Sequence, residues 1–131
     1  MDHAAAKNWL DRYMAAWLSY DRKSIGELFS EDVTYRYHPH DDAIVGRGGV
    51  VASWLGGTAS DDASTRDAPG TYVGSYLPVA IDGDVVVATG TSTYLRQPGG
   101  PVERVYDNCF VMRFDAAGQC KEFTEYYVKR S

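Results

Sequence analysis

Apolar positions in the first third of the chain recur three or four residues apart, as they do on one face of a helix. Over residues 2–20 this spacing predicts a long amphipathic helix. Its apolar face carries Trp9, Tyr13, Ala16, Trp17 and Tyr20. Ser24, followed three positions later by Glu27, has the pattern of a capping box and predicts that a short second helix opens at Ser24.

The spacing of apolar residues then changes from helical to alternating. Residues 33–38 alternate and predict a strand, which Pro39 ends. One face of this strand carries Val33, Tyr35 and Tyr37. Residues 46–55 return to a helical spacing and predict a third, short helix, and residues 58–70 predict a polar loop. The buried side of the third helix is expected to carry Val50, Val51, Trp54 and Leu55.

The second half of the chain is patterned as strands separated by turns. The predicted strands cover residues 72–81, 85–95, 102–114 and 119–128. Asp82 and Gly83, closed by Ile81 and Asp84, have the composition of a two-residue hairpin turn. This order predicts an α+β fold: a cone-shaped, curved antiparallel sheet wrapped around a long N-terminal helix, with two further short helices, in one domain over residues 1–131.

Side-chain alternation in the last two strands predicts which residues face the interior. If a four-residue turn joins these strands, Phe110 lies opposite Phe123 and Asn108 lies opposite Glu125. The more aromatic faces of both strands then coincide. Glu125 is therefore expected to point inward, between Phe123 and Tyr127, with Asn108 as its neighbour.

Two details of the sheet are less strongly patterned. Cys120 reaches the inner face only if a bulge near Lys121 shifts the alternation. In the strand at residues 85–95, the face with Thr91 and Thr93 is more apolar than its opposite, and we expect it to point inward.

Composition and charge exclude several classes of partner. The chain has 131 residues, 44% of them hydrophobic, and a net charge of −5 without a basic patch, so nucleic acid is not expected as a partner. It has neither a signal-peptide pattern nor a membrane-spanning apolar run, which predicts no membrane partner and a cytoplasmic location. Its two cysteines do not form a disulfide framework. Its ten tyrosines suit a pocket with apolar walls and polar tips.

Motifs for cofactors and metals are absent from the sequence. There is no G-x-G-x-x-G, P-loop or G-x-S-x-G motif, so neither nucleotide binding nor serine hydrolysis is supported. The stretch "HPHDD" carries His38, His40, Asp41 and Asp42, but its spacing matches no standard set of zinc ligands. It is read as a polar turn, and we expect neither a metal nor a cofactor. His38 alone stays a candidate base near the mouth of a pocket.

Three segments resemble the nuclear-transport-factor-two-like superfamily, in its SnoaL-like branch. They are "RYMAAWLSYDRKSIGELFSEDVTYRYHP", "GRGGVVASWL" and "YDNCFVMRFDAAGQCKEFTEYYV", and together they span nearly the whole chain. The resemblance implies a cystatin-like α+β barrel with a deep pocket between the sheet and the long helix, often in a homodimer. The superfamily holds ketosteroid isomerases, limonene-epoxide hydrolases, scytalone dehydratases, polyketide cyclases and many non-catalytic members, so the fold alone does not imply a reaction.

The resemblance to ketosteroid isomerase covers one of three site residues. Tyr13 matches the tyrosine of its oxyanion hole. Its catalytic aspartate falls on Tyr37 or His38, and its second oxyanion acid falls on Phe110. Steroid isomerisation is therefore not implied.

The resemblance to limonene-epoxide hydrolase is also incomplete. Glu125 matches an active-site aspartate, and Tyr35 matches a water-positioning tyrosine. The asparagine that shares this water falls on Tyr37, and the arginine–aspartate pair of the hydrolase falls on Thr91 and Thr93. The match agrees that Glu125 faces the pocket, but it supplies no reaction.

These observations leave two hypotheses of different classes. In the first, the protein is an enzyme without a cofactor that isomerises, cyclises, dehydrates or hydrates a small hydrophobic, oxygenated metabolite. Its catalytic residues would be Glu125, Tyr35 and Tyr13. The residues expected to bind substrate are Trp17, Tyr37, His38, Trp54, Thr91, Thr93, Asn108, Phe110, Met112, Phe123 and Tyr127. In the second, Glu125 is a structural carboxylate paired with Asn108, and the protein is a ligand-binding or dimerisation module.

A homodimer is predicted from the outer face of the sheet. The strand at residues 102–114 is apolar on both sides, and its outer row carries Val105, Cys109 and Val111. Because the long helix can cover only the concave side, a second copy is expected to cover this row.

Overall fold

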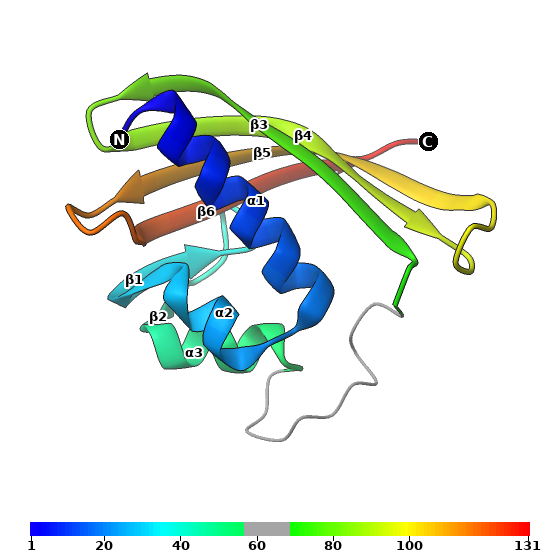
Figure 1. Cartoon of the computed structure of the whole chain (residues 1–131), viewed down its shortest axis with the longest axis horizontal. Helices are drawn as coiled ribbons and strands as arrows, with labels where there is room; N and C mark the ends of the chain where they lie inside the picture. The colour runs from blue at the N-terminus through cyan, green and yellow to red at the C-terminus, as the bar shows by residue number, and fades with distance from the viewer. Residues whose placement is uncertain (57–68) are drawn as a thin grey trace.

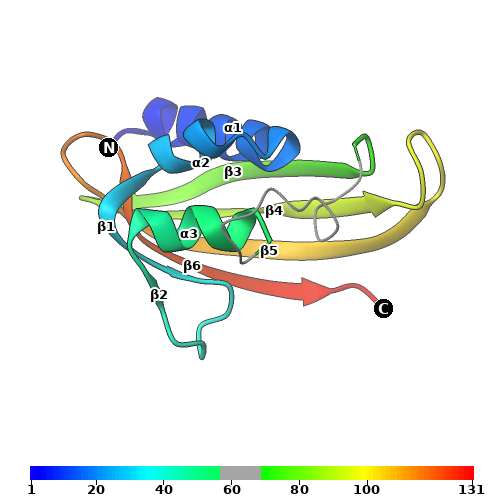
Figure 2. The same ribbon diagram turned by 90° about the horizontal axis from the view of Figure 1, so that it is seen from below.

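Helices lie against one face of a curved sheet in the computed structural model, which describes residues 1–56 and 69–131 (Figure 1 and Figure 2). The elements in chain order are α1 (His3–Ser19), α2 (Arg22–Glu27), β1 (Phe29–Arg36), β2 (Ile44–Val45), α3 (Arg47–Trp54), β3 (Tyr72–Asp82), β4 (Val85–Leu95), β5 (Val102–Phe114) and β6 (Cys120–Lys129). The predicted α+β class is confirmed. Most of the predicted polar loop at residues 58–70 falls outside the described residues.

The six strands form one sheet in the order β2-β1-β6-β5-β4-β3. Neighbouring strands pair antiparallel except β1 and β6, which run parallel, so the prediction of an all-antiparallel sheet is wrong at this pair. No tight turn joins β1 to β6, and therefore no hairpin sets their relative direction. The sheet is curved and open, because its two edge strands, β2 and β3, do not pair.

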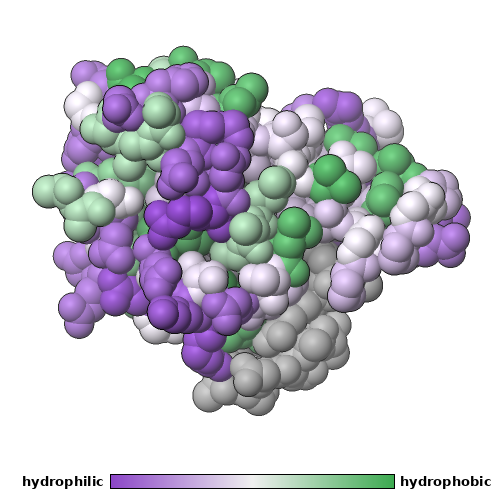
Figure 3. Space-filling view, in the orientation of Figure 1, coloured by the Kyte–Doolittle hydropathy of each residue, from purple (hydrophilic) through white to green (hydrophobic). Residues whose placement is uncertain are grey.

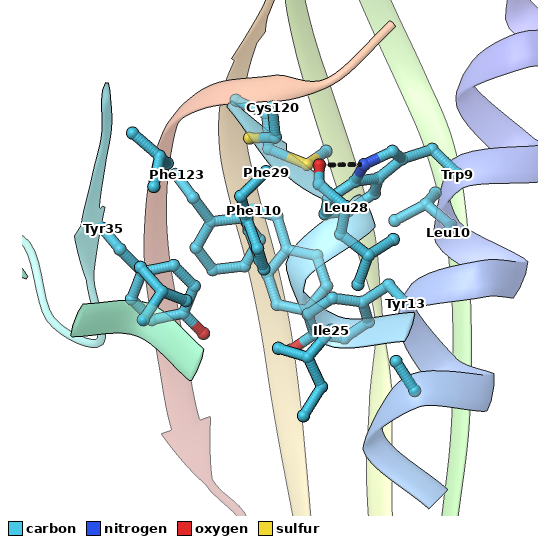
Figure 4. Close-up of a cluster of buried hydrophobic side chains, with 14 of the residues drawn as sticks. Trp9, Leu10, Tyr13, Ile25, Leu28, Phe29, Tyr35, Phe110, Cys120 and Phe123 are labelled. Carbon is cyan, nitrogen blue, oxygen red and sulfur yellow. Dashed lines mark hydrogen bonds between the residues drawn. The ribbon is translucent and has the colours of Figure 1, made fainter. Parts of the chain in front are cut away.

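The core lies between α1 and the concave face of the sheet. Trp9 is 1% exposed, and its Nε1 donates to the carbonyl oxygen of Leu28 at 2.9 Å (Figure 4). Its ring centroid lies 5.3 Å from that of Phe114 and 5.6 Å from that of Tyr13. Burying each such side chain contributes about 1.5–3 kcal/mol, so these aromatic contacts anchor α1 to the sheet.

The second helix begins two residues before the predicted start. Asp21 is its N-cap, and its carboxylate accepts hydrogen bonds from the backbone N–H of Ser24 at 3.0 Å and from the Ser24 hydroxyl at 2.7 Å. Ser24 is thus the third residue of the helix, and the capping box predicted from Ser24 and Glu27 does not form. A carboxylate and a hydroxyl are comparably good N-caps, so the spacing alone did not separate the two registers.

The turn between β3 and β4 is displaced by one residue from the prediction. Asp82 pairs with Val85, which leaves Gly83 and Asp84 as the turn residues. Gly83 has a φ of 60°, a left-handed conformation that glycine adopts without steric strain. Gly83 therefore occupies the first position of the two-residue turn, whereas it was predicted to occupy the second.

The register of β5 on β6 differs from the prediction by two residues. Phe110 pairs with Glu125, and Met112 pairs with Phe123, whereas Phe110 was expected opposite Phe123. A shift of two residues keeps every side chain on its predicted face. Glu125 therefore points inward as expected.

Two one-residue changes add up to this shift. Phe114 pairs with Cys120 rather than with Gln119, so the turn is one residue longer than predicted. The register then shifts again between Arg113 and Phe114, leaving Lys121 unpaired in a bulge. The bulge predicted near Lys121 is confirmed, and it brings Cys120 into the core at 0% exposure.

The predicted inner face of β4 is wrong. Val86, Ala88 and Ser92 are buried, so Thr91 and Thr93 lie on the outer face of the sheet. The inner position at Gly90 must be small because β3 crowds it: a Cβ atom there would clash with the backbone oxygen of Ser75 and would lie 2.7 Å from the ring of Tyr76. Apolar content did not distinguish the faces, since the outer face of this sheet is itself apolar.

Candidate active site

A cavity of about 190 Å³ opens at one end of the core, between α1 and the concave face of the sheet. Its described lining residues are Tyr13, Trp17, Tyr35, Tyr37, Tyr72, Tyr76, Ser92, Tyr94, Arg104, Tyr106, Asn108, Glu125 and Tyr127. They come from α1, from β1 and the residue after it, and from the four strands β3 to β6. Most are tyrosines, which present apolar rings and polar hydroxyl groups to the cavity.

Glu125 is the one acidic side chain among the described lining residues. It is half-buried on the inner face of β6, and its Oε2 accepts a hydrogen bond from Nδ2 of Asn108 at 2.9 Å. Burial raises the pKa of the Glu125 carboxyl group to about 7, although the Asn108 hydrogen bond and the nearby His38 act in the opposite direction. At neutral pH this group is poised to give or to take a proton.

The Asn108 side chain is itself the start of a buried hydrogen-bond chain. Its Oδ1 accepts from the hydroxyl of Ser92 at 2.9 Å, and the Ser92 oxygen lies 2.6 Å from the hydroxyl of Tyr76. The Tyr76 hydroxyl is in turn hydrogen-bonded to that of Tyr72. Since the Ser92 proton goes to Asn108, Tyr76 must donate to Ser92. The chain therefore orients the amide of Asn108 so that its N–H₂ group faces Glu125.

Tyr35 brings a hydroxyl group without a protein partner to the cavity. Its side chain is 1% exposed, and its Oη has no hydrogen-bond partner among the described residues. Nε1 of the neighbouring Trp54 likewise has no partner within hydrogen-bond distance among the described residues, although this N–H acts to lower the pKa of Tyr35 against the larger effect of burial. Trp54 can therefore only donate to the Tyr35 oxygen, and the Tyr35 proton itself has no acceptor in the part of the chain that the structure describes. Burial raises the pKa of Tyr35 and of Tyr13 well above the ordinary range, so both keep their hydroxyl protons at neutral pH. An unpaired buried hydroxyl costs stability, which makes a bound oxygen atom its natural acceptor.

A second hydrogen-bonded group lies beside the cavity. Nε2 of His38 is 2.6 Å from the hydroxyl of Tyr127, and Nδ1 of His38 is 2.9 Å from Oδ2 of Asp41. The hydrogen bond from His38 lowers the pKa of Asp41, and burial raises the pKa of Tyr127. Asp41 therefore accepts the Nδ1 proton, which leaves Nε2 to accept the proton of Tyr127.

The mouth of the cavity carries a belt of tyrosine rings that crosses four strands. Neighbouring ring centroids are 5.4 Å apart between Tyr72 and Tyr94, 5.8 Å apart between Tyr94 and Tyr106, and 5.4 Å apart between Tyr106 and Tyr127. The guanidinium carbon of Arg104 lies 4.1 Å from the Tyr94 ring centroid. This distance is that of a cation–π contact.

The structure brings together part of the predicted site. Seven of the predicted residues line the cavity: Tyr13, Trp17, Tyr35, Tyr37, Asn108, Glu125 and Tyr127. His38 lies beside them through its hydrogen bond to Tyr127. Four others belong to the packed core rather than to the cavity wall: Trp54, Phe110, Met112 and Phe123. In Figure 4, Phe123 and Phe110 lie between Tyr35 and Tyr13, and their rings contact those of the two tyrosines.

Two predicted residues are misplaced, and several lining residues were missed. Thr91 and Thr93 cannot reach the cavity, because they lie on the outer face of β4. The missed residues are Tyr72, Tyr76, Ser92, Tyr94, Arg104 and Tyr106. Alternation along β5 carried a signal for Arg104 and Tyr106, which share a face with Asn108. Ser92 and Tyr94 lie on the inner face of β4, and Tyr72 and Tyr76 lie on the paired strand β3. These four could be identified only once the inner face of β4 was known.

Metal and membrane features are absent from the part of the chain that the structure describes. No group of three or more His, Cys, Asp or Glu side chains there is placed to hold a metal ion. None of the described helices combines the length and apolar character needed to cross a membrane. The cavity chemistry described above consists of one carboxyl group, hydroxyl groups, an amide and one guanidinium group.

Comparisons with known proteins agree with this fold. The family model for the SnoaL-like domain matches residues 10–123. A crystal structure of an NTF-2-like protein of unknown function from Burkholderia xenovorans LB400 superposes with a TM-score of 0.67 at 13% identity, covering 98% of this chain and 86% of that one. No curated protein sequence matches the chain significantly.

A second solved structure is similar to the same extent. It is SalBIII, described as an epoxide hydrolase/cyclase-like enzyme in pyran ring formation in the polyether salinomycin. It superposes with a TM-score of 0.69 at 14% identity, covering 97% of this chain and 93% of that one. At these identities both structures show a shared fold and no more.

Proposed function

The chain belongs to the SnoaL-like domain family, and from that premise we propose that it is a general acid–base enzyme acting without a cofactor on a small, hydrophobic, oxygenated molecule. One observation carries the proposal. A carboxyl group with a pKa of about 7, that of Glu125, lines a cavity whose walls also hold the unpartnered hydroxyl of Tyr35. Such a pair can transfer a proton and bind the oxygen atom on which charge develops.

The proposed roles follow from the hydrogen bonds of each group. Asn108 holds Oε2 of Glu125, so Oε1 is the oxygen that would exchange a proton with the substrate. Tyr35 and Tyr13, which both line the cavity, would donate to a substrate carbonyl, hydroxyl or ether oxygen. Each donor adds stabilisation of developing negative charge only if it is already oriented, and burial in an aromatic wall orients both phenols.

The reaction types open to this site are isomerisation, dehydration, cyclisation and addition of water. All four require one proton to leave one atom of the reactants and one proton to arrive at another atom. The similar enzyme SalBIII has a role in pyran ring formation, a ring closure through oxygen, and this supports cyclisation as one candidate among the four. The His38–Tyr127 pair could accept the second proton beside the cavity mouth.

A second candidate function is ligand binding without chemistry. The hydrogen-bond chain from Glu125 through Asn108 and Ser92 to Tyr76 favours it, because structural networks also shift the pKa of carboxyl groups. The two candidates differ in one property: a catalytic Glu125 must exchange protons with a bound molecule, whereas a structural one need only keep its hydrogen bond to Asn108.

We also propose that the protein is a cytoplasmic homodimer whose subunits meet through the outer face of the sheet. The exposed apolar side chains of this face include Val73, Leu77, Val111, Tyr126 and Val128. The described helices lie on the opposite face, where Figure 3 shows hydrophilic residues interspersed with smaller hydrophobic groups. A second copy would bury the apolar outer face by two-fold symmetry. The unpaired thiols of Cys109 and Cys120 suit a reducing compartment.

The test of catalysis uses a panel of terpenoid and polyketide-like ketones, hydroxy-epoxides and enones. Each compound is incubated with the protein in deuterium oxide, and mass spectrometry follows isomeric products and deuterium uptake. Glu125→Gln should abolish any turnover found, while the affinity for the same compound stays within about tenfold. Glu122→Gln, the same change on the exposed part of β6, is the matched control and should keep full turnover. Full activity in Glu125→Gln would overturn the proposal.

A further inference from the structure

The charged groups of the cavity lie at its two ends. Among the described lining residues, Arg104 is the one cation and Glu125 the one carboxyl group, and all the others are uncharged at neutral pH. Arg104 and Asn108, the hydrogen-bond partner of Glu125, are four residues apart on the inner face of β5. Four residues of strand span roughly 13 Å, so the backbone positions of the cation and of the residue that holds the acid are about one small molecule apart.

Arg104 is held in a geometry that suits a carboxylate. It pairs with Tyr94 across the β4–β5 ladder, and its guanidinium carbon lies 4.1 Å from the Tyr94 ring centroid and 5.9 Å from that of Tyr106. A guanidinium group held against aromatic rings keeps its N–H donors at its edge, where a carboxylate can accept two hydrogen bonds at once. The Arg104 side chain is 31% exposed, so a ligand can reach it.

Acceptors within the protein compete only weakly with a ligand for the guanidinium group of Arg104. Nη1 of Arg104 donates to Oε1 of Glu103 at 3.1 Å, but the Glu103 side chain is 49% exposed. An ion pair this exposed contributes little to stability, because water screens it. The Tyr106 hydroxyl also hydrogen-bonds the guanidinium group, so a ligand carboxylate competes with one exposed carboxylate and one phenol for its donors. Glu103 and the net charge of −5 also make a singly charged anion a better fit than a doubly charged one.

We propose that the cavity mouth is a carboxylate subsite formed by Arg104 and that the substrate is a small, unsaturated, oxygenated carboxylic acid. Its carboxylate lies on Arg104, its flat body lies against the rings of Tyr94, Tyr106 and Tyr127, and its oxygenated end reaches Glu125 and Tyr35. The Tyr106 ring stands at 89° to the rings of both Tyr94 and Tyr127, so these three rings offer both faces and edges to a planar molecule. The position of the reacting end rests on the proposed function, whereas the carboxylate subsite does not.

The experiment compares 4-hydroxycinnamate with 4-hydroxycinnamamide, which have the same shape but differ in charge at one end. Isothermal titration calorimetry at pH 7 and low ionic strength should show the acid binding at least about tenfold tighter than the amide. Added salt should narrow this difference, because screening weakens an accessible ion pair. Equal affinities of the two compounds, or no binding of the acid at millimolar concentration, would overturn the proposal.

Three variants test whether Arg104 causes the preference for the acid over the amide. Arg104→Gln should remove the preference for the acid, because the acid loses an ion pair whereas the amide loses at most a neutral hydrogen bond, and Arg104→Lys should give an intermediate preference. Arg96→Gln, which removes one charge from an exposed position outside the cavity lining, is the matched control and should keep the full preference. A preference that survives Arg104→Gln would overturn the assignment. If the preference depends on Arg104 but Glu125→Gln retains turnover, the proposed chemistry fails and the carboxylate subsite stands.

Discussion

The hydroxyl oxygen of Tyr127 lies 2.6 Å from Nε2 of His38, although 89 positions separate the two residues in the chain. Asp41 holds the other ring nitrogen of His38 at 2.9 Å. A carboxylate, an imidazole and a phenol thus form one hydrogen-bonded row that ends at the cavity wall. In such a row the ring nitrogen facing the carboxylate keeps the proton, and the other nitrogen is the acceptor.

Nitrogen-15 NMR of labelled histidine tests this arrangement. We expect neutral His38 to carry its proton on Nδ1, with Nε2 as the hydrogen-bond acceptor. Asp41→Asn should shift the balance between the two tautomers, and Tyr127→Phe should remove the hydrogen bond at Nε2. His3, at the exposed start of α1, supplies a resonance that neither change should move. A His38 ring protonated mainly on Nε2 would contradict the row.

The titration of Glu125 is the second prediction. Carbon-13 NMR of the labelled carboxyl group should give a pKa near 7, because burial disfavours the charged form. Asn108→Leu should raise the pKa further, since it removes a donor that stabilises the carboxylate. If the measured pKa is at or below the ordinary value of about 4.3, the desolvation argument for catalysis is lost.

The pH dependence of stability follows from the same shift. The folded state holds the Glu125 proton up to a pKa of about 7, whereas the unfolded chain loses it near the ordinary pKa of 4.5. Folding is therefore disfavoured progressively as the pH rises from about 4.5 to 7. Glu125→Gln has no such proton, so it should gain stability relative to the wild type across this range, by roughly 1–3 kcal/mol at pH 8.

Urea denaturation of both proteins at pH 4 and at pH 8 measures this difference. Glutamine keeps an oxygen that can accept from Nδ2 of Asn108, so packing should change little. The control Glu122→Gln should show no corresponding gain. A stability difference between Glu125→Gln and the wild type that does not change with pH would show that Glu125 is not desolvated in the folded state.

The unpartnered hydroxyl of Tyr35 leads to a prediction in which stability and function move in opposite directions. Tyr35→Phe removes a buried polar atom that has no hydrogen-bond partner among the described residues, so stability should be unchanged or should rise by about 1 kcal/mol. Any turnover found should fall by about tenfold to a hundredfold, because an oxygen-binding donor is lost. A loss of stability of more than about 1 kcal/mol, seen by thermal denaturation, would show that the hydroxyl has a structural partner instead.

The proposed dimer interface is tested by a charge at its centre. Val111 is 36% exposed on the outer face of β5, and a second copy would bury it. Val111→Glu should split the dimer, because an unpaired buried carboxylate costs several kcal/mol. Light scattering at micromolar concentration measures the mass of both proteins. Ala15→Glu, on the exposed side of α1, is the control and should remain dimeric.

Two results would rule out this interface. The first is a wild-type protein that stays monomeric at micromolar concentration. The second is a Val111→Glu variant that remains fully dimeric, which would place the contact surface elsewhere on the molecule.

Local patterns in the sequence determined most of the elements and the orientation of Glu125, but they missed the short strand β2 and the start of β1 at Phe29, four residues before the predicted strand. The helical spacing around Trp9 and Tyr13 and the alternation in the late strands show which side chains must be buried. This spacing is set by the repeat of each helix or strand itself, so it can be read without knowing the neighbouring elements. The alternation placed Glu125 correctly on the inner face, although its observed partner is Phe110 and its predicted partner was Asn108. The two registers differ by two residues, and an even shift leaves each side chain on the same face of the sheet.

Tertiary structure alone decided how the faces and distant residues combine. Thr91 and Thr93 lie outside because the backbone oxygen of Ser75 and the ring of Tyr76 leave no room for a side chain at the inner position Gly90, and no pattern within β4 records atoms that come from β3. The contact between His38 and Tyr127 arises because β1 runs alongside β6, a pairing that no turn specifies. The cavity lining is likewise drawn from α1 and from five strands or their ends, so its members share a place in space but no period in the sequence.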